Sequence, residues 1–249
     1  MHSLHLLSII LLIALSSPAN SEPDTHKTIT VGFFPEDYPP LFWHDEREGI
    51  IEQTLAAISE RSHFLFERKL YPFNRLIQHV AEGKLDLEAW TSPAWRQSVK
   101  DKVYFTEPFT RHCEIMVFLK DKPFHVESPK DLIGKKVGTV QGFTFPSYTD
   151  YFDSNKIQRI SGNDEEGVLH MLKHGRSELA FMDELAANYL LKQKQFNSFE
   201  SKNHFDCVPI TFMFNKEKET TGKKINEILL NLKQEGIIEK IKNNFSKKQ

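Results

Sequence analysis

Two charged side chains, Arg96 and Asp183, are the first candidates for a site that binds a small charged solute. A site for a zwitterion needs a cation for the carboxylate, an anion for the ammonium group and apolar walls. A guanidinium in a desolvated cleft binds a carboxylate through two parallel hydrogen bonds, which makes Arg96 the best candidate for the cation. Asp183 follows the apolar run Ala180-Phe-Met182, and ligands of open α/β sheets bind outside the ends of such strands. The alternatives are a surface arginine at the start of a helix and an aspartate that caps the helix from Glu184.

The segment before Arg96 adds three candidates. Glu88 and Trp90 belong to the predicted strand 85–90. Glu88 would supply a second anion, which favours a more cationic ligand, and Trp90 would form a flat wall. The alternative is that Glu88 is exposed on a strand edge and Trp90 is part of the core. Thr91, which follows directly, belongs to the same candidate set.

Two further segments supply hydroxyl and aromatic groups. Thr144 follows Gln141-Gly142-Phe143 at the predicted start of a helix, where free N–H groups and the helix dipole favour a carboxylate. Tyr38 and Trp43 lie in the loop after the first predicted strand, and an aromatic face attracts a desolvated cation. Phe42, in the same loop, is better explained as an ordinary core residue.

The apolar pattern alternates between short β-type runs and longer helical runs, which predicts an α/β fold. Leu76, Ile77 and Val80, for example, recur at helical spacing until Gly83 ends the run. The predicted strands are residues 28–33, 64–70, 85–90, 114–119, 136–140, 178–182 and 207–214. The predicted helices are residues 51–62, 73–82, 141–152 and 163–174, with two more from residue 221.

This order predicts two α/β lobes, the second inserted in the first, as in a clamshell that closes around a small ligand. Lobe 1 comprises residues 22–112 and 209–249, and lobe 2 comprises residues 113–208. The crossing segments near residues 109–115 and 206–212 would form the hinge.

The 249 residues carry a formal net charge of −2, which gives no electrostatic reason to expect binding to nucleic acid or to an anionic membrane. Residues 1–21 contain no Asp, Glu, Lys or Arg, and residues 4–15 are almost wholly apolar. A run of that length is shorter than the roughly 20 residues that span a bilayer. The small-x-small pattern Ala19-Asn-Ser21 predicts a cleaved signal peptide. Because no Cys lies near the cleavage point, we expect a periplasmic or secreted protein rather than a lipoprotein.

Export permits a disulfide between Cys113 and Cys207, each of which begins a β-rich run. The alternative is two buried free thiols. His170 and His174 have the i, i+4 spacing of metal ligands, but no third ligand is evident and a solvated helix face is the better interpretation. No motif for a nucleotide, a cofactor or a catalytic serine is found.

Several motifs, taken in order, resemble the family 3 periplasmic solute-binding proteins, which deliver amino acids and similar solutes to ABC importers. The resemblance covers essentially the whole mature chain. The motifs are Thr28-Ile-Thr-Val-Gly-Phe33, Tyr38-Pro-Pro-Leu-Phe-Trp43, Gly49-Ile-Ile-Glu52, Pro72-Phe-Asn-Arg75, Gly83-Lys-Leu-Asp86, Leu132-Ile-Gly-Lys-Lys-Val-Gly-Thr-Val-Gln-Gly142 and Gly175-Arg-Ser-Glu-Leu-Ala-Phe-Met-Asp183.

The resemblance implies a monomeric receptor that presents its closed form to ABC permease subunits. It implies that Arg96 and Thr144 bind the carboxylate of an amino acid, that Asp183 binds the ammonium group, and that an aromatic residue of the first loop stacks on the ligand. The chain departs from the family pattern at Glu88-Ala-Trp90, where small hydroxyl residues are usual, and at Phe143.

Two other functions remain open on the sequence. Proteins of this fold include periplasmic cyclohexadienyl dehydratase-like enzymes, in which a buried carboxylate such as Glu88 or Asp183 would act as a general acid. A sensory receptor for a membrane signalling partner would have the same sequence features.

Overall fold

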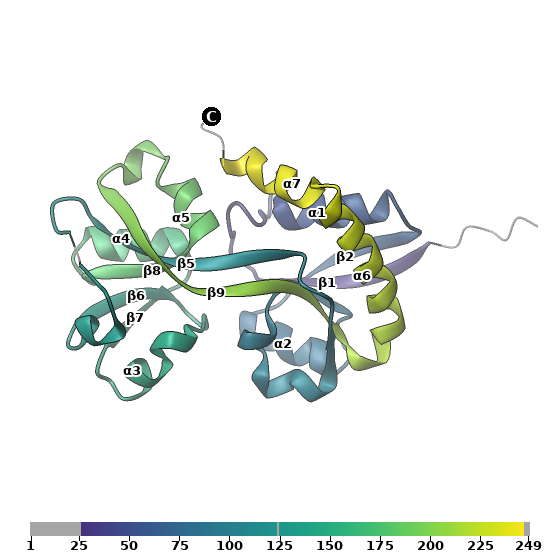
Figure 1. The fold of residues 1–249 in the computed structure, drawn as a ribbon, viewed down its shortest axis with the longest axis horizontal. Coiled ribbons are helices and arrows are strands. Elements are labelled where there is room, and N and C mark those ends of the chain that lie inside the picture. Colours follow the sequence, from purple (N-terminus) through teal and green to yellow (C-terminus); the bar gives the residue numbers. More distant parts are fainter. Residues whose placement is uncertain (1–25, 124, 247–249) are drawn as a thin grey trace, which may run out of the picture.

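The computed structural model describes residues 26–123 and 125–246, which form two α/β lobes on one mixed β-sheet (Figure 1). The strands follow the order β2-β1-β3-β9-β5-β8-β6-β7, and β4 pairs with β9 beside this path. The fold class predicted from the alternating pattern is therefore confirmed. The predicted signal peptide, residues 1–21, lies outside the described residues.

The first lobe packs helices on both faces of its part of the sheet. β1 pairs in parallel with both β2 and β3, and β3 and β4 pair antiparallel with β9. Three helices, α1, α6 and α7, cover one face, and α2 covers the other (Figure 1). The bounds are β1 (Lys27–Phe33), α1 (Ile50–Ser59), β2 (Phe64–Leu70), α2 (Phe73–Ala81), β3 (Leu87–Thr91), β4 (Val103–Phe105), α6 (Glu219–Gln234) and α7 (Ile237–Ser246).

The second lobe repeats this layering on a smaller scale. β6 pairs in parallel with β7 and β8, and β8 continues the sheet antiparallel to β5. The helices α4 and α5 pack on one face of this sheet, and the segment around α3 packs on the other. The bounds are β6 (Lys136–Val140), α3 (Thr149–Asp153), β7 (Gln158–Gly162), α4 (Glu165–Lys173), β8 (Leu179–Asp183) and α5 (Glu184–Leu190).

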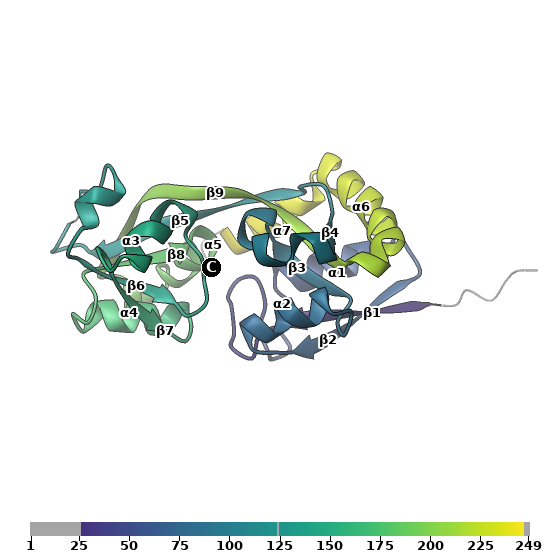
Figure 2. The same cartoon turned by 90° about the horizontal axis from the view of Figure 1, so that it is seen from below.

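Two long antiparallel strands, β5 (Thr110–Leu119) and β9 (Phe199–Asn215), run from one lobe into the other along one side of the molecule (Figure 2). A disulfide joins Cys113 of β5 to Cys207 of β9 with a Cα–Cα distance of 4.1 Å. The predicted lobe boundaries fall within these two strands, so the segments predicted to form the hinge belong largely to β5 and β9.

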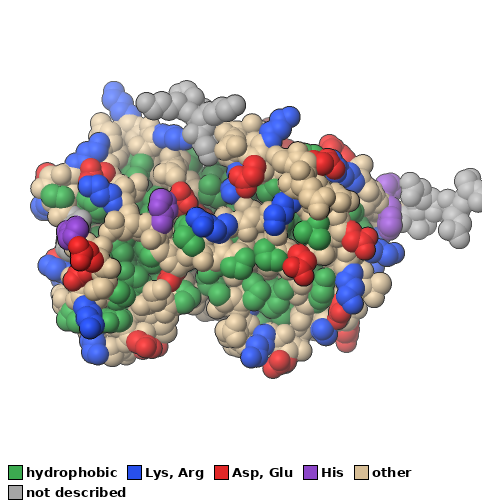
Figure 3. Space-filling view, in the orientation of Figure 1, with side chains coloured by type: hydrophobic (Ala, Val, Ile, Leu, Met, Phe, Trp, Pro, Cys, Tyr) green, Lys and Arg blue, Asp and Glu red, His purple; other side chains and the backbone are tan. Residues whose placement is uncertain are grey.

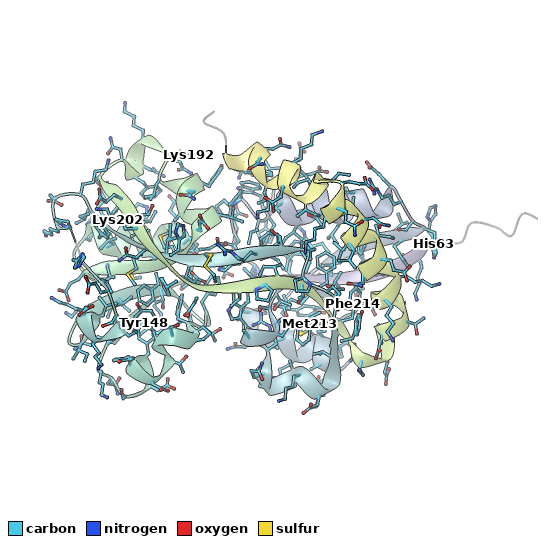
Figure 4. All side chains as sticks on the ribbon, in the orientation of Figure 1. His63, Tyr148, Lys192, Lys202, Met213 and Phe214 are labelled. Carbon is cyan, nitrogen blue, oxygen red and sulfur yellow. A yellow bond between two sulfur atoms is a disulfide. The ribbon has the colours of Figure 1, made fainter. Side chains whose placement is uncertain are left out.

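Side chains that alternate in direction along β5 and β9 pack into the core on both faces of the sheet. Met213 packs with the residues around α2, whereas its neighbour Phe214 packs in the cluster beneath α1 and α6 (Figure 4). Ile115 and Met116 divide in the same way between the two faces of the second lobe. Since successive side chains of a strand point to opposite faces, each strand supplies both layers of core.

The helix predicted for residues 141–152 is wrong in its first part. Residues 141–142 form a turn, residues 143–145 are irregular, and helical structure begins with a 3₁₀ segment at Pro146–Tyr148, followed by α3. Proline disfavours the α conformation in the residue before it, and Phe145 accordingly has φ −127° and ψ 89°. Thr144 therefore does not lie at a helix N-terminus.

Two smaller boundaries also differ from the prediction. Asp164, and not Asn163, caps α4, because its Oδ1 accepts the N–H of Gly167 at 2.6 Å. β9 begins at Phe199, earlier than the predicted start at Cys207. In the described part of the chain, no helix has the length and apolar character needed to cross a membrane.

Candidate functional site

A cavity lies where the two lobes meet. In the space-filling view the lobes touch across the middle of the molecule, and a notch separates them along the lower edge (Figure 3). Both lobes supply walls, and eight of the 18 lining residues are Phe, Tyr or Trp. The aromatic lining residues include Phe34, Tyr38, Phe73, Trp90, Trp95 and Phe143.

Four of these rings contact one another in a closed circuit, which we call the aromatic box. The centroid of Phe34 lies 5.8 Å from that of Tyr38 and 5.5 Å from that of Phe73. Phe143 closes the circuit at 5.6 Å from Tyr38 and 5.8 Å from Phe73. Phe143 comes from the second lobe and the other three from the first, so the box is complete only when the lobes approach each other.

Arg96 and Glu88 form one polar corner of the cavity, the arginine corner. Nε of Arg96 donates to Oε2 of Glu88 at 2.9 Å, and Nη2 donates to Oε1, which makes the pair bidentate. Nη1 donates to the carbonyl oxygen of Trp95 at 3.2 Å. The two charged side chains are only 4% and 6% exposed. The guanidinium charge is thus already neutralised by a carboxylate of the protein.

An irregularity in β3 shapes this corner. The pairing of β3 with β9 shifts register between Glu88 and Thr91, and Trp90 has φ +68°. A bulky residue rarely adopts this left-handed conformation, and such strain is typically found at functional sites. Glu88, Ala89 and Trp90 consequently all line the cavity.

His112, Glu114 and Asp183 form a second polar corner, the histidine corner, at the crossing strands. Nε2 of His112 lies 2.9 Å from Oε1 of Glu114, and Nδ1 lies 3.5 Å from Oδ2 of Asp183. The hydroxyl of Tyr38 donates to the same Oδ2 at 3.0 Å and so connects the first lobe to the second. Oδ1 of Asp183 accepts the N–H of Leu185 at 2.7 Å. All three corner residues are buried.

The charges of the histidine corner shift the pKa values of its members. Burial alone would lower the pKa of His112, but the charges of Asp183 and Glu114 outweigh burial and raise it to about 9. His112 is therefore an imidazolium at neutral pH. Burial raises the pKa of Glu114, and the neighbouring imidazolium offsets part of this rise. Burial and the charges of Glu114 and Asp183 raise the pKa of Glu165, which lies behind the corner.

Five of the residues predicted from sequence line the cavity. They are Tyr38, Glu88, Trp90, Arg96 and Thr144. Asp183 is not a lining residue. It lies behind Tyr38 and His112 and caps α5, the alternative role noted for it above.

Two predicted residues lie elsewhere. Trp43 packs on Tyr189 of α5 at 5.7 Å and on Phe245 of α7 at 6.0 Å, so it contacts the second lobe outside the cavity. Thr91 is fully buried in the sheet, where its carbonyl oxygen accepts the hydroxyl of Thr211 at 3.1 Å. The hydroxyl oxygen of Thr91 has no hydrogen-bond partner among the described residues.

Sequence reasoning missed His112, Glu114 and two rings of the aromatic box, Phe34 and Phe73. A signal for the first two was present, because residues i and i+2 of a strand share a face. The predicted strand began only at Glu114, however, and the imidazole of His112 joins the same face because β5 begins earlier, at Thr110. Phe73 carried no comparable signal, since its contact depends on how the lobes meet.

The architecture is that of the type II periplasmic binding proteins. The ligand-binding core of GluR0 in complex with L-glutamate superposes with a TM-score of 0.77 at 20% identity, covering 89% of this chain and 99% of that one. An ancestral arginine-binding protein bound to arginine superposes with a TM-score of 0.74 at 22% identity, covering 89% and 99%. At these identities the similarity establishes the fold.

The family follows from the sequence comparison. Residues 29–248 match the bacterial extracellular solute-binding proteins, family 3. The L-cystine-binding protein TcyJ of Bacillus subtilis (strain 168) is 23% identical over 252 residues, which cover 95% of this chain and 91% of that protein. The chain belongs to the family 3 solute-binding proteins, as its ordered motifs predicted.

Proposed function

We propose that this protein binds a small amino-acid-related solute outside the cytoplasm and delivers it to an ABC importer. The observation that carries the proposal is the cavity between the lobes, in which the aromatic box and two polar corners converge. Pockets for small ligands are concave and mostly apolar, with a few polar groups that fix orientation. Family membership and the L-cystine-binding relative support a solute of amino-acid size.

Closure of the lobes would couple binding to delivery. Tyr38 reaches from the first lobe to Asp183 of the second, and Phe143 packs on two rings of the first lobe. A ligand in the cavity would add contacts to both sides and so favour the closed form, because a ligand shifts a conformational equilibrium toward the state that it binds better. The closed form would then be recognised by the permease subunits.

The proposed ligand contacts are the five lining residues named above, with Asp183 acting through Tyr38 and His112. Trp43 is assigned to the contact between the lobes and Thr91 to the support of β3. The protein is proposed to reach the periplasm through a cleaved signal peptide and to act as a monomer.

A thermal-shift screen of the purified protein against amino acids, amines, polyamines and small organic acids tests this function. A ligand at about 100 times its Kd adds about 2.7 kcal/mol to the free energy of unfolding. For a chain of this size that corresponds to a rise in Tm of roughly 5–10 °C. A rise confined to one chemical class supports the proposal, and the absence of a rise with every class would overturn it.

Catalysis is a second candidate, favoured by one observation: the buried carboxyl group of Glu114 lines the cavity with a raised pKa. A carboxyl group with a raised pKa can act as a general acid. Incubating each compound that raises the Tm with the protein, followed by mass spectrometry, distinguishes the two functions. A receptor leaves the compound unchanged, whereas an enzyme converts it.

A further inference from the structure

We infer that the ligand is an organic amine with an apolar body and no carboxylate, bound in the aromatic box with its ammonium group toward Glu114. This inference rests on the proposed function and specifies its substrate class. It departs from the expectation that Arg96 receives the carboxylate of an amino acid.

The arginine corner has no net charge to offer a carboxylate. Glu88 holds two N–H groups of Arg96, and the carbonyl of Trp95 holds a third. A ligand carboxylate would have to share one buried guanidinium with Glu88, which places two like charges next to each other in a site that excludes water. An amine without a carboxylate avoids that repulsion.

The groups around the cavity contain a surplus of acids. Among the described residues at the two corners and directly behind them, four carboxyl groups accompany two basic groups. Burial together with mutual repulsion raises the pKa values of Glu114 and Glu165, the response expected of carboxyl groups that lack enough cations. A bound cation would supply the missing charge. The carboxyl groups belong to Glu88, Glu114, Glu165 and Asp183, and the basic groups to Arg96 and His112.

Three polar atoms of the lining residues have no hydrogen-bond partner among the described residues: Nε1 of Trp90, Nδ1 of His112, which faces Asp183 at 3.5 Å, and Oε2 of Glu114. Oε1 of Glu114 is occupied by His112, but Oε2 is buried and has no hydrogen-bond partner among the described residues. A buried acceptor without a donor is costly, and a donor from the ligand would remove that cost. An ammonium group offers three N–H donors together with a positive charge.

The aromatic box suits the same ligand. Cages of aromatic rings bind organic cations through the negative faces of the rings. The guanidinium of Arg96 already lies 5.1 Å from the centroid of Phe73, so one face of the box accommodates a cation of the protein itself. The other three rings, Phe34, Tyr38 and Phe143, also line the cavity, where the body of the ligand would contact them.

Isothermal titration calorimetry with matched pairs of compounds tests the inference on the unmodified protein. Each pair is an amino acid and its decarboxylated amine: phenylalanine with phenethylamine, tyrosine with tyramine, and arginine with agmatine. We expect at least one amine to bind 10-fold or more tightly than its amino acid. Tighter binding of the amino acids would overturn the inference but leave the proposed function intact. If none of the amines binds, the inference fails, whereas the proposed function fails only if the thermal-shift screen finds no ligand in any class.

Two isosteric variants locate the cation. Glu114→Gln removes the charge of the vacant acceptor and should weaken amine binding at least 10-fold. Glu88→Gln frees the charge of Arg96, so the preference should move toward the amino acid by at least 10-fold. Glu127→Gln is the matched control, because Glu127 is 79% exposed and away from the cavity. Unchanged amine binding in a folded Glu114→Gln protein would overturn the assignment.

Discussion

The two polar corners of the cavity are built from similar groups but differ in charge balance. In the arginine corner one cation meets one carboxylate through two hydrogen bonds. In the histidine corner one imidazolium lies between two carboxylates, and an acceptor of Glu114 is left without a partner among the described residues. This difference shows that the residue type alone does not decide whether a side chain binds a charged ligand. An arginine that is neutralised by a carboxylate of its own chain has no net charge for a ligand, whereas a corner with surplus negative charge can bind a cation.

Substitution of Arg96 should have the largest effect on stability. Arg96→Ala leaves Glu88 buried without its cation, and breaking a buried ion pair in this way costs about 3–5 kcal/mol of unfolding free energy. The double variant Glu88→Leu/Arg96→Met removes both charges and should recover most of this loss. Urea denaturation monitored by circular dichroism gives both values.

A surface pair provides the control for this prediction. Arg61 and Glu235 also form a bidentate pair, but it is exposed, so Arg61→Ala should change stability little. If the double variant is as unstable as Arg96→Ala, or if Arg61→Ala costs as much, the arginine corner does not stabilise the lobe as a buried neutral pair.

The histidine corner should make the free energy of unfolding depend on pH. The pKa of His112 rises from 6.5 to about 9 on folding. The contribution of His112 to the free energy of unfolding is therefore fully present below pH 6.5. It is lost as the pH rises through 9, and the loss is on the order of 3 kcal/mol. The pKa of Glu114 is also raised on folding, so its contribution to the free energy of unfolding likewise falls as the pH rises. That fall begins at a lower pH than the fall due to His112. Thermal melts between pH 6 and pH 10 measure the decline.

His112→Gln should flatten this decline, since glutamine does not titrate. His125→Gln is the control, because the side chain of His125 is 87% exposed. A profile of His112→Gln that falls as steeply as that of the wild type would show that the imidazolium is not the source of the pH dependence.

The hydroxyl of Tyr38 should have the smallest effect of the three. Tyr38→Phe removes the hydrogen bond to Asp183 and keeps the ring in the aromatic box. The expected loss is about 1 kcal/mol of unfolding free energy. Tyr151→Phe, on α3 in the second lobe, is the comparison. Equal losses in the two variants would mean that the hydrogen bond between Tyr38 and Asp183 does not itself stabilise the protein.

The order of the elements was predictable because it depends on local pattern. β2 was predicted at residues 64–70 and is found there. Leu76 and Val80 mark α2 through their helical spacing, and both are buried on the predicted face. The prediction failed at residues 141–145, where the restriction that Pro146 places on Phe145 outweighed an apolar pattern that fitted a helix.

The site was predictable only as a set of candidates. The chain by itself determined that Tyr38, Glu88 and Arg96 would lie near strand ends, because periodicity and turn residues place the ends of strands. Tertiary structure alone decided that Glu88 neutralises Arg96 and that His112 lies between Glu114 and Asp183. These contacts depend on a bulge in β3, on the register shift of β5 at His112 and on the pairing of Glu114 with Asp183 between β5 and β8. Since charges act through space over a few ångströms, only the folded chain establishes which charges remain for a ligand.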